Sequence, residues 1–234
     1  MDFTSIKAIT IPQGNVTQIA VGSTVLWKSS PLPSAYQRVE WIRNSTGSTT
    51  NAYIDLGFAF DTAATIYLHY RAETGSAYVF GAAESSGKYR CMITSTTTDE
   101  MFYGSNGSGY IANGLTGGVG EYNIKYRLKE GWLSATNWVN GESQKGITQA
   151  AYTMTRNLYL FAQNYNGSAR FGDIRRISYF KYYDKNNTLI CNLVPCYRKS
   201  DGVIGMYDLV SNTLFTNVGT GTFVKGPIVG DSST

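Results

Sequence analysis

The strongest constraint on the fold of this chain is the segment 192–227, in which short apolar runs alternate with turn signals. The pair Asp201-Gly202 closes a polar turn, because both residues tolerate a positive φ. The remaining runs and turns are, in order, an apolar run at 203–210, a turn at 211–212, a run at 214–216, a bend at 219–221 and a run from Phe223. Strands this short cannot form a stable unit alone, so the segment must complete a larger sheet.

The same pattern continues upstream. In 66–71, apolar and polar residues alternate as they do in a half-buried strand, and 122–129 repeats this alternation. Residues 158–162 are apolar throughout, which is typical of a central strand. Further strands are expected at 78–82, 89–94, 101–103, 132–139, 174–183 and 189–194, with a hairpin turn at 140–141 and one short helix near 36–43. Many short strands joined by turns predict an all-β antiparallel sandwich.

Composition supports this fold class and excludes several functions. Among 234 residues there are 18 Tyr and 25 Gly, and only 15% are charged, which favours strands and tight turns. The net charge is +4, but the basic residues are scattered and form no stripe, so no nucleic-acid partner is expected. No apolar stretch approaches the roughly 18 residues needed to cross a bilayer, and no secretion signal is visible, so no membrane partner is expected either.

Four parts are expected along the chain. Residues 1–28 form a small N-terminal β unit, with strands at 5–11, 16–21 and 24–27, that serves docking or oligomerisation; a plain extension of the main sheet is the alternative. Residues 29–34 read as a linker, because Pro31 and Pro33 stiffen it. The sandwich itself spans 35–229, and 230–234 is expected to be a disordered tail.

Two motifs carry a resemblance to a known family. One is Val-Pro-Cys-Tyr-Arg-Lys at 194–199 followed by Asp-Gly-Val-Ile-Gly-Met-Tyr-Asp at 201–208. The other is Leu-Pro-Ser-Ala-Tyr-Gln-Arg-Val-Glu-Trp-Ile at 32–42, with Ser-Thr-Gly at 45–47 and Tyr-Ile-Asp-Leu-Gly at 53–57. Together they resemble the end and the start of LamG-like, concanavalin-A-like lectin domains in virion structural proteins of phages and prophages, over roughly 32–227.

The resemblance implies a concanavalin-A-like jelly roll of two packed sheets. It also implies a virion location, in a tail fibre, baseplate or other receptor-binding part, after assembly in the bacterial cytoplasm. Residues 4–28 are similar to short N-terminal segments of phage tail-associated proteins, so they would contact other virion proteins. The unpaired edges of this unit favour a homo-oligomer, for which we expect a trimer.

The sequence shows no catalytic arrangement. Hydrolases of this fold place acidic residues two positions apart on one strand, and the chain has only the adjacent pair Asp99-Glu100, whose members point to opposite faces. The single histidine, His69, has no neighbouring nucleophile and is expected to be structural. Cys91, Cys191 and Cys196 lack metal-site spacing and are expected to be small apolar side chains. We therefore expect no enzyme activity and no bound metal.

Calcium is the one cofactor that the sequence does not exclude. Relatives of this fold can hold a calcium ion between loops, and Asp184, Asn186 and Asn187 offer oxygen ligands. An Asx turn explains the same three residues more simply, so no cofactor is expected.

Sugar binding is the chemistry that remains. Aromatic rings offer flat apolar faces to sugar rings, and amides bind the hydroxyls. The candidate ligand-binding residues are Tyr103, Asn106, Tyr110, Trp132, Trp138, Asn164 and Tyr165. For each aromatic residue, packing within the fold is the alternative.

The expected function is non-enzymatic binding of bacterial surface polysaccharide by a phage virion protein. Two alternatives stay open: a capsid-decoration or tail-assembly protein that binds no sugar, and a glycoside hydrolase of the same fold. An exposed loop aromatic with polar neighbours would favour sugar binding. A broad apolar patch near 4–28 would favour assembly, and two carboxylates about 5–10 Å apart would favour hydrolysis.

Overall fold

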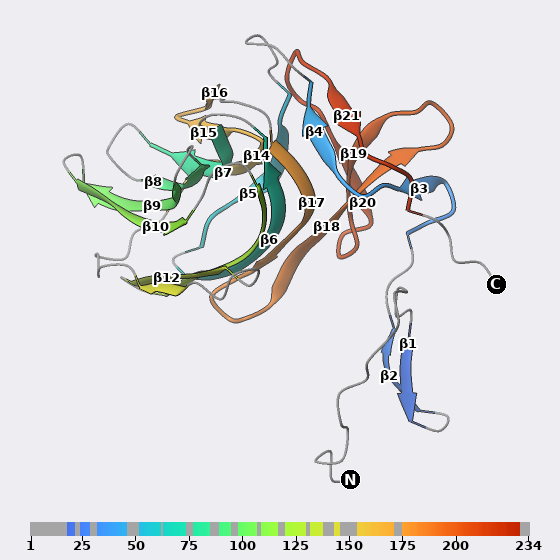
Figure 1. Ribbon diagram of the computed structural model, residues 1–234, viewed down its shortest axis with the longest axis horizontal. Helices are drawn as coiled ribbons and strands as arrows, with labels where there is room; N and C mark the ends of the chain where they lie inside the picture. The colour runs from blue at the N-terminus through green and yellow to red at the C-terminus, as the bar shows by residue number, and fades with distance from the viewer. Residues whose placement is uncertain are drawn as a thin grey trace.

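The structure is a computed structural model, and the residues that it describes form an all-β protein (Figure 1). The described residues are 18–21, 24–28, 32–45, 52–61, 63–73, 77–84, 89–94, 98–106, 109–116, 120–129, 132–137, 143–145, 154–170 and 175–229. Side chains are described in 32–45, 52–61, 63–71, 73, 78–84, 154–170 and 176–229. These ranges contain no helix that is long and apolar enough to cross a membrane.

The first of two large sheets has eight strands in the order β10-β9-β8-β7-β14-β5, with the β15–β16 hairpin beside β7. Its strands are β5 (Ile54–Ala59), β7 (Ala77–Ala83), β8 (Tyr89–Thr94), β9 (Thr98–Asn106), β10 (Gly109–Thr116), β14 (Asn157–Leu160), β15 (Gln163–Tyr165) and β16 (Ser168–Arg170). All of its pairings are antiparallel except the parallel pairing of β15 with β7.

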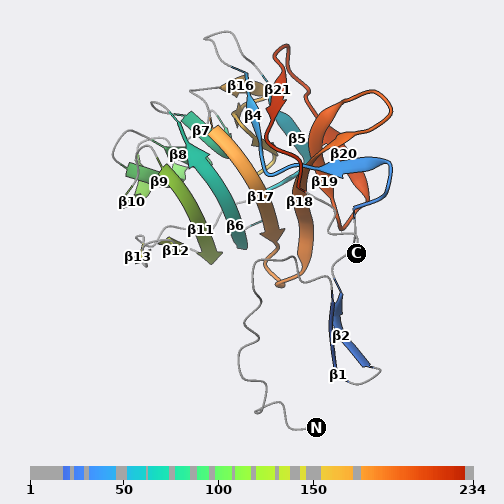
Figure 2. The ribbon, with the colours of Figure 1, turned by 45° about the vertical axis from the view of Figure 1, so that its right-hand side comes forward.

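The second sheet has eleven strands in the order β13-β12-β11-β6-β17-β18-β19-β20, with β3, β4 and β21 joined to it at the side. Its strands are β3 (Tyr36–Arg38), β4 (Ile42–Asn44), β6 (Ala64–Ala72), β11 (Gly120–Lys129), β12 (Trp132–Asn137), β13 (Ser143–Lys145), β17 (Arg175–Tyr183), β18 (Leu189–Arg198), β19 (Ile204–Asp208), β20 (Thr213–Thr216) and β21 (Phe223–Lys225). Figure 2 shows β11, β6 and β17 side by side within it. The two sheets form the expected jelly-roll sandwich.

The core between the sheets follows from the alternation in the sequence. Ile66, Leu68 and Tyr70 of β6 are buried, whereas the residues between them lie partly in solvent. Aromatic rings fill the space between the layers, and the Phe80 ring of β7 lies 5.6 Å from the Phe180 ring of β17. Ring pairs of this geometry add about 0.5–1.5 kcal/mol to the burial of their apolar area.

The segment 192–227 folds as its turn signals predict. Gly202 has φ +73° in the turn that separates β18 from β19, and Asn212 has φ +57° in the turn before β20. At Gly205 a Cβ atom would lie 2.2 Å from the backbone oxygen of Phe215, so this position must be glycine for β19 and β20 to pair so closely.

A second, smaller apolar cluster lies outside the main core, on β18 and β19. Val194, Cys196 and Tyr207 are buried there, and Leu32 and Tyr36 pack against them, with ring centroids 4.8 Å apart between Tyr36 and Tyr207. Leu32 falls inside the expected linker 29–34, so the packing that belongs to the sandwich begins at Leu32.

The two ends of the sandwich meet. The backbone amide of Val229 donates a hydrogen bond to the carbonyl oxygen of Arg38 (3.1 Å), and the Gln37 side chain donates to the carbonyl oxygen of Val229 (3.2 Å). Val39 and Ile228 form an isolated antiparallel bridge beside these bonds. The first strand of the sandwich and its last described residues are therefore hydrogen-bonded to each other.

The expectation of a short helix near 36–43 is wrong. This stretch contains β3, which pairs with Cys196, Tyr197 and Arg198, and the start of β4, which pairs with both β17 and β21. The backbone hydrogen bonds that these neighbouring strands offer outweigh the weak local preference for a helix.

At the N-terminus, β1 (Gln18–Val21) and β2 (Thr24–Lys28) pair antiparallel, as the last two strands of the expected N-terminal unit. The expected first strand at 5–11 and the tail at 230–234 lie outside the described residues. Within the described part, β1 and β2 form a two-stranded sheet of their own and lie apart from the sandwich in Figures 1 and 2.

Cys191 and Cys196 on β18 are buried free thiols, as expected for small apolar side chains. Burial raises the pKa of the Cys196 thiol to about 12 and also raises the pKa of Cys191, so both thiols stay protonated near neutral pH. The Cys91 side chain lies outside the described residues.

Candidate ligand-binding site

The candidate site is the β15–β16 hairpin, which carries two of the predicted sugar-binding residues. Its strands are joined by Asn166 and Gly167, with φ values of +52° and +93°. Positive φ at both central residues is the signature of a type I′ turn, for which Asn-Gly is the preferred sequence. The local sequence therefore closes this hairpin tightly and presents Asn166 to solvent.

Phe161 sets the direction in which the hairpin leaves β14. β14 runs antiparallel to β7 and β15 runs parallel to it, so the chain reverses direction between them. Phe161 lies at this reversal with φ +65°, and its amide donates to the carbonyl oxygen of Val79 (2.7 Å). A positive φ is strained for a bulky residue, and the surrounding structure must hold it. Its ring is buried and lies 5.0 Å from the Phe223 ring, which provides that support.

Asn164 holds the base of the hairpin together. Asn164 is 3% exposed, and its side-chain amide donates to the carbonyl oxygen of Asn157 (3.0 Å) and accepts a hydrogen bond from the amide of Gly167 (2.8 Å). Both ends of the amide are thus engaged with the backbone. Asn164, predicted as a sugar ligand, lies beneath the site and fixes its shape.

The solvent-facing part of the hairpin combines an aromatic ring with two guanidinium groups. The Arg170 guanidinium lies over the Tyr165 ring, 3.3 Å from its centroid. The Arg156 guanidinium donates to Asn166 Oδ1 (2.7 Å). We call Arg156, Tyr165, Asn166 and Arg170 the hairpin site.

The hairpin site can bind a polar ligand with an apolar face. Tyr165 is partly exposed, and Arg170 and Asn166 are exposed. The amide of Asn166 and the guanidinium groups offer hydrogen bonds, whereas the Tyr165–Arg170 stack offers a flat surface. Beside the site, Glu84 Oε1 accepts hydrogen bonds from the amide (2.7 Å) and the hydroxyl (2.8 Å) of Thr155, which fixes the start of the segment that carries Arg156.

The other predicted residues lie elsewhere. Tyr103 and Asn106 are on β9 and Tyr110 is on β10, which form one hairpin at the edge of the eight-stranded sheet. Trp132 is on β12 of the other sheet, which lies near β10. The side chains of these four residues, and all of Trp138, lie outside the described residues. The predicted residues that lie on described strands therefore divide between two separate hairpins and β12.

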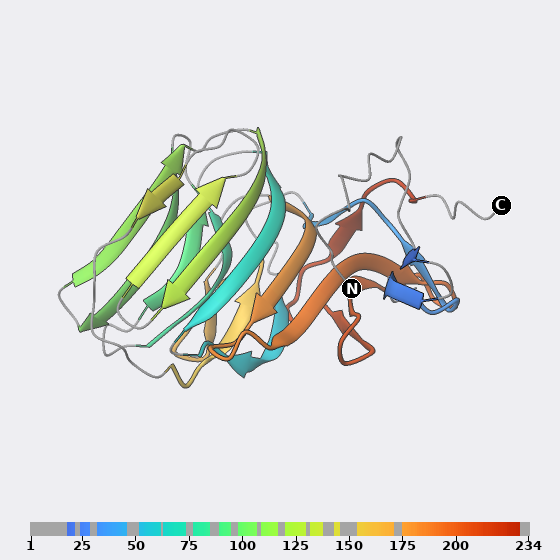
Figure 3. The same ribbon diagram turned by 90° about the horizontal axis from the view of Figure 1, so that it is seen from below.

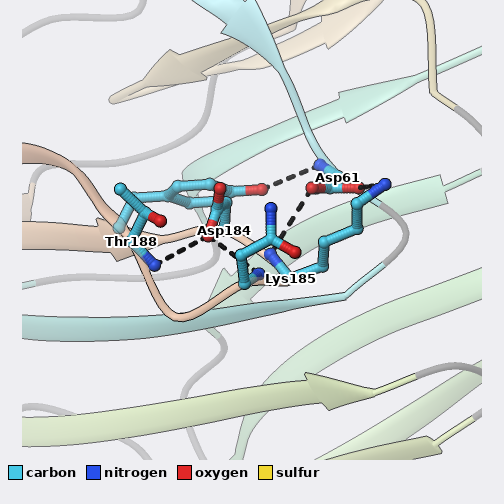
Figure 4. Close-up of polar contacts among 6 residues, drawn as sticks. Asp61, Asp184, Lys185 and Thr188 are labelled. Atoms are coloured by element: carbon cyan, nitrogen blue, oxygen red, sulfur yellow. Dashed lines mark hydrogen bonds and ion pairs between the residues drawn. The ribbon is translucent and has the colours of Figure 1, made fainter.

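The loop after β17, predicted as a possible calcium site, is shown in Figure 4. Asp184 Oδ1 accepts hydrogen bonds from the amides of Asn186 (2.9 Å) and Thr188 (2.7 Å), as in an Asx turn, and Asn187 has φ +62°. Nearby, Lys185 Nζ lies 4.0 Å from Asp61 Oδ1.

This loop does not fit calcium, which takes about six to eight oxygen ligands. The Asp184 carboxylate already caps the turn, and a lysine ammonium lies beside Asp61. Among the described residues, no three His, Cys, Asp or Glu side chains cluster as metal ligands would.

His69 is partly buried and stacks on Tyr179, with ring centroids 5.8 Å apart.

A hollow of about 310 Å³ opens between the C-terminal strands, with Ile204 and Phe223 among its walls. Asn217 shapes its rim, because its side chain accepts hydrogen bonds from the amides of Tyr53 and Gly219 and donates to the carbonyl oxygens of Gly219 and Gly221. The side-chain amide of Asn217 lines this hollow, and its hydrogen bonds go to the surrounding backbone.

Of the four residues in the hairpin site, the sequence predicted Tyr165 as a sugar ligand, whereas the candidate ligands did not include Arg156, Asn166 or Arg170. One signal was present in the sequence: Arg170 follows Tyr165 by five residues across an Asn-Gly turn, which places both on a short hairpin. Arg156 carried no comparable signal, because it comes from the segment before β14.

Comparison with solved structures supports the fold. The mouse laminin α1 chain, domains LG4-5, matches with a TM-score of 0.52 and 11% identity, over 82% of this chain. This chain spans 47% of the length of that laminin fragment. The match identifies the fold as the jelly roll of laminin LG domains. No protein-family model matches the chain, and no curated protein matches it in sequence.

Two further solved structures are more distant. One is tailspike protein 2 of the Escherichia coli O157:H7 bacteriophage CAB120, with a TM-score of 0.37 and 13% identity, over 54% of this chain and 20% of that one. The other is Scytalido-glutamic peptidase, with a TM-score of 0.34 and 13% identity, over 82% of this chain and all of that one. Likeness at this level carries no inference about activity.

Proposed function

We propose that this chain is a non-enzymatic, carbohydrate-binding module of a phage virion that attaches to bacterial surface polysaccharide. The observation that carries the proposal is the hairpin site. A partly exposed Tyr165 lies among polar groups at a sharply defined turn, and this is the arrangement expected of a sugar-binding loop.

The construction of the hairpin supports a binding role. Burial of Asn164 and the strained Phe161 fix the backbone, so Tyr165 and Asn166 are held in place before any ligand arrives. Preorganisation of this kind reduces the entropy lost on binding. The laminin-like jelly roll supplies a rigid scaffold beneath it.

The virion setting rests on the sequence motifs at 32–57 and 194–208. In this proposal the module works without a cofactor, residues 4–28 contact other virion proteins, and the chain assembles as a homotrimer. Light scattering on the purified protein tests the trimer, and a monomer at micromolar concentration overturns it.

The test of sugar binding is titration of purified bacterial cell-wall polysaccharides against the wild type, Tyr165→Ala and Arg170→Ala. Loss of the stacking surface lowers affinity by about tenfold in each variant. Lys225→Ala is the matched control, because Lys225 lies over the Tyr197 ring (5.0 Å) elsewhere on the sandwich. Tyr103→Ala and Trp138→Ala measure the contribution of the other predicted residues.

Two results overturn the proposal. If the intact protein binds none of these polysaccharides, the chain is an assembly protein of the virion. If it releases sugars from them, the chain is a glycoside hydrolase.

A further inference from the structure

The outer face of the eleven-stranded sheet carries a second set of aromatic and basic side chains. On β6, the side chains of Tyr67, His69 and Arg71 alternate with the buried core residues and lie on the solvent side. On β17, Tyr179 pairs with His69 and Lys181 pairs with Tyr67. Tyr183 pairs with Thr65, which lies two residues before Tyr67 on β6. Figure 3 views the molecule from the side on which β11, β6 and β17 form the front layer.

Three arginines lie side by side across this face. Arg176 of β17 pairs in register with Arg71 of β6 on one side and with Arg43 of β4 on the other. Like charges directly opposite each other on neighbouring strands destabilise a sheet. The row therefore opposes folding unless an anion neutralises it.

One carboxylate already neutralises part of the row. Glu73 forms ion pairs with Arg176 and with Arg43, the latter at 3.9 Å between Nε and Oε2. The Arg176 guanidinium also lies over the Trp41 ring, 4.1 Å from its centroid, which fixes its position. The structure itself thus shows this row holding a carboxylate.

On the far side of Arg71, Glu121 of β11 is its partner in register, so this row brings together three arginines and two glutamates and keeps one positive charge. Arg71 is exposed, and no ion pair of its guanidinium is seen within the described residues. Lys181 adds a fourth cation two rows further along the face. The described side chains of this face include a single carboxylate, that of Glu73, and four cations, which are Arg43, Arg71, Arg176 and Lys181.

Aromatic side chains continue the face beyond the arginines. His69 stacks on Tyr179 in the next row, and the Tyr67 and Tyr183 rings meet edge to face at 5.8 Å. Lys181 Nζ lies 5.9 Å from the Tyr179 centroid. From Arg71 to Thr65 the face extends along β6 for roughly 20 Å, which is long enough for several sugar units of an extended chain.

We propose that this cationic–aromatic face, formed by Arg43, Arg71, Arg176, Lys181, Tyr67, His69, Tyr179 and Tyr183, binds an acidic polysaccharide whose sugar units carry carboxylates. Guanidinium groups match carboxylates in shape and charge, as Glu73 demonstrates here. The aromatic rows provide contact area for the sugar rings between the charged groups.

The face is a different surface from the hairpin site. It lies on β6 and β17 of the eleven-stranded sheet, whereas the hairpin site belongs to the eight-stranded sheet. The inference therefore does not rest on sugar binding by the hairpin, and Tyr165→Ala is expected to leave binding at this face unchanged.

The experiment measures binding of polygalacturonate to the full chain by calorimetry, at low and at moderate ionic strength. Neutral dextran, poly(glycerol phosphate) and duplex DNA serve as comparison polymers. The variants are Arg71→Gln and Lys181→Gln. Lys199→Gln is the matched control, because Lys199 is exposed in the turn after β18 and its loss changes the net charge equally. Thermal melts verify that every variant is folded.

The expected result is binding of polygalacturonate but not dextran, weakened by salt as the Debye length shortens. Arg71→Gln and Lys181→Gln each lower affinity by about tenfold, whereas Lys199→Gln does not. Three results overturn the inference: no binding of polygalacturonate, equal losses in all three lysine and arginine variants, or equally tight binding of poly(glycerol phosphate) or DNA.

Discussion

Asp208 Oδ1 accepts a hydrogen bond from the backbone amide of Asn192, at 2.7 Å, and so joins the end of β19 to β18. The same carboxylate also accepts hydrogen bonds from the amides of Val210 (3.1 Å) and Ser211 (3.0 Å) in the turn that follows. Asp208 is 2% exposed, so one buried side chain connects two strands and caps the turn before β20.

Replacing Asp208 with alanine is expected to lower the free energy of unfolding by about 3 kcal/mol, because three backbone donors lose their acceptor. The melting temperature falls by about 6–12 °C for a chain of this size. Asp208→Asn keeps one accepting oxygen and is expected to lose less. Glu40→Ala, at an exposed position, is the control, and equal melting of the Asp208→Ala variant and this control contradicts the prediction.

Gly205→Ala is expected to destabilise the protein by about 2–3 kcal/mol, because the new methyl group meets the backbone oxygen of Phe215 and pushes β19 from β20. Chemical denaturation measures the loss. Gly202→Asn is the control, since Gly202 faces open space and asparagine tolerates its positive φ. An alanine at 205 that leaves the denaturation midpoint unchanged shows that the strands are not packed this closely.

Asn164→Ala separates structural support from ligand contact. It removes hydrogen bonds to Asn157 and Gly167, so it is expected to lower the free energy of unfolding by about 2 kcal/mol. Tyr165→Ala, in contrast, is expected to lower polysaccharide affinity with little loss of stability. Thermal melts and binding titrations on both variants test this division, and a stable Asn164→Ala protein with lost binding would assign the amide to the ligand.

Stability is expected to respond to the state of Asp201 at low pH. The hydrogen bonds from Arg198 are the main cause that lowers the pKa of Asp201 below its ordinary value of 3.8. The pair therefore stabilises the folded state above about pH 4, and this contribution disappears as the pH falls through the lowered pKa. Because both side chains lie in solvent, the effect is small.

The measurement compares the melting temperatures of the wild type and Asp201→Asn. Their difference is expected to be present near pH 7 and to shrink as the pH falls through the lowered pKa of Asp201, because a protonated Asp201 is neutral like the asparagine that replaces it. A difference that stays constant over this range assigns the effect of the substitution to the turn rather than to the ion pair.

Much of the fold is predictable because alternation and turn chemistry are local. The strand expected at 89–94 coincides with β8, and the turn at Asp201-Gly202 adopts the positive φ that its sequence favours. Other strands were missed. β10 carries glycine at both its start and its middle, and β16 has only three residues, so pairing with neighbours determines both.

The candidate sites are less predictable because they depend on long-range geometry. Tyr165 could be recognised as an aromatic residue in a polar turn, but its position relative to Arg156 depends on the reversal at Phe161. On the outer face, the sequence indicates that Tyr67 and His69 point outward. The alignment of three arginines, however, depends on the register of strands distant in sequence and on an irregularity of β17 between Ile177 and Tyr179.

The meeting of Arg38 with Val229 has a consequence for engineering. Because the two ends of the sandwich lie side by side, a short linker can join them. New termini can then be opened in the exposed turn at 185–187, which gives a circular permutant with the same strand pairing. The same geometry allows the whole sandwich to be spliced into a surface loop of a host scaffold, with the hairpin site still facing outward.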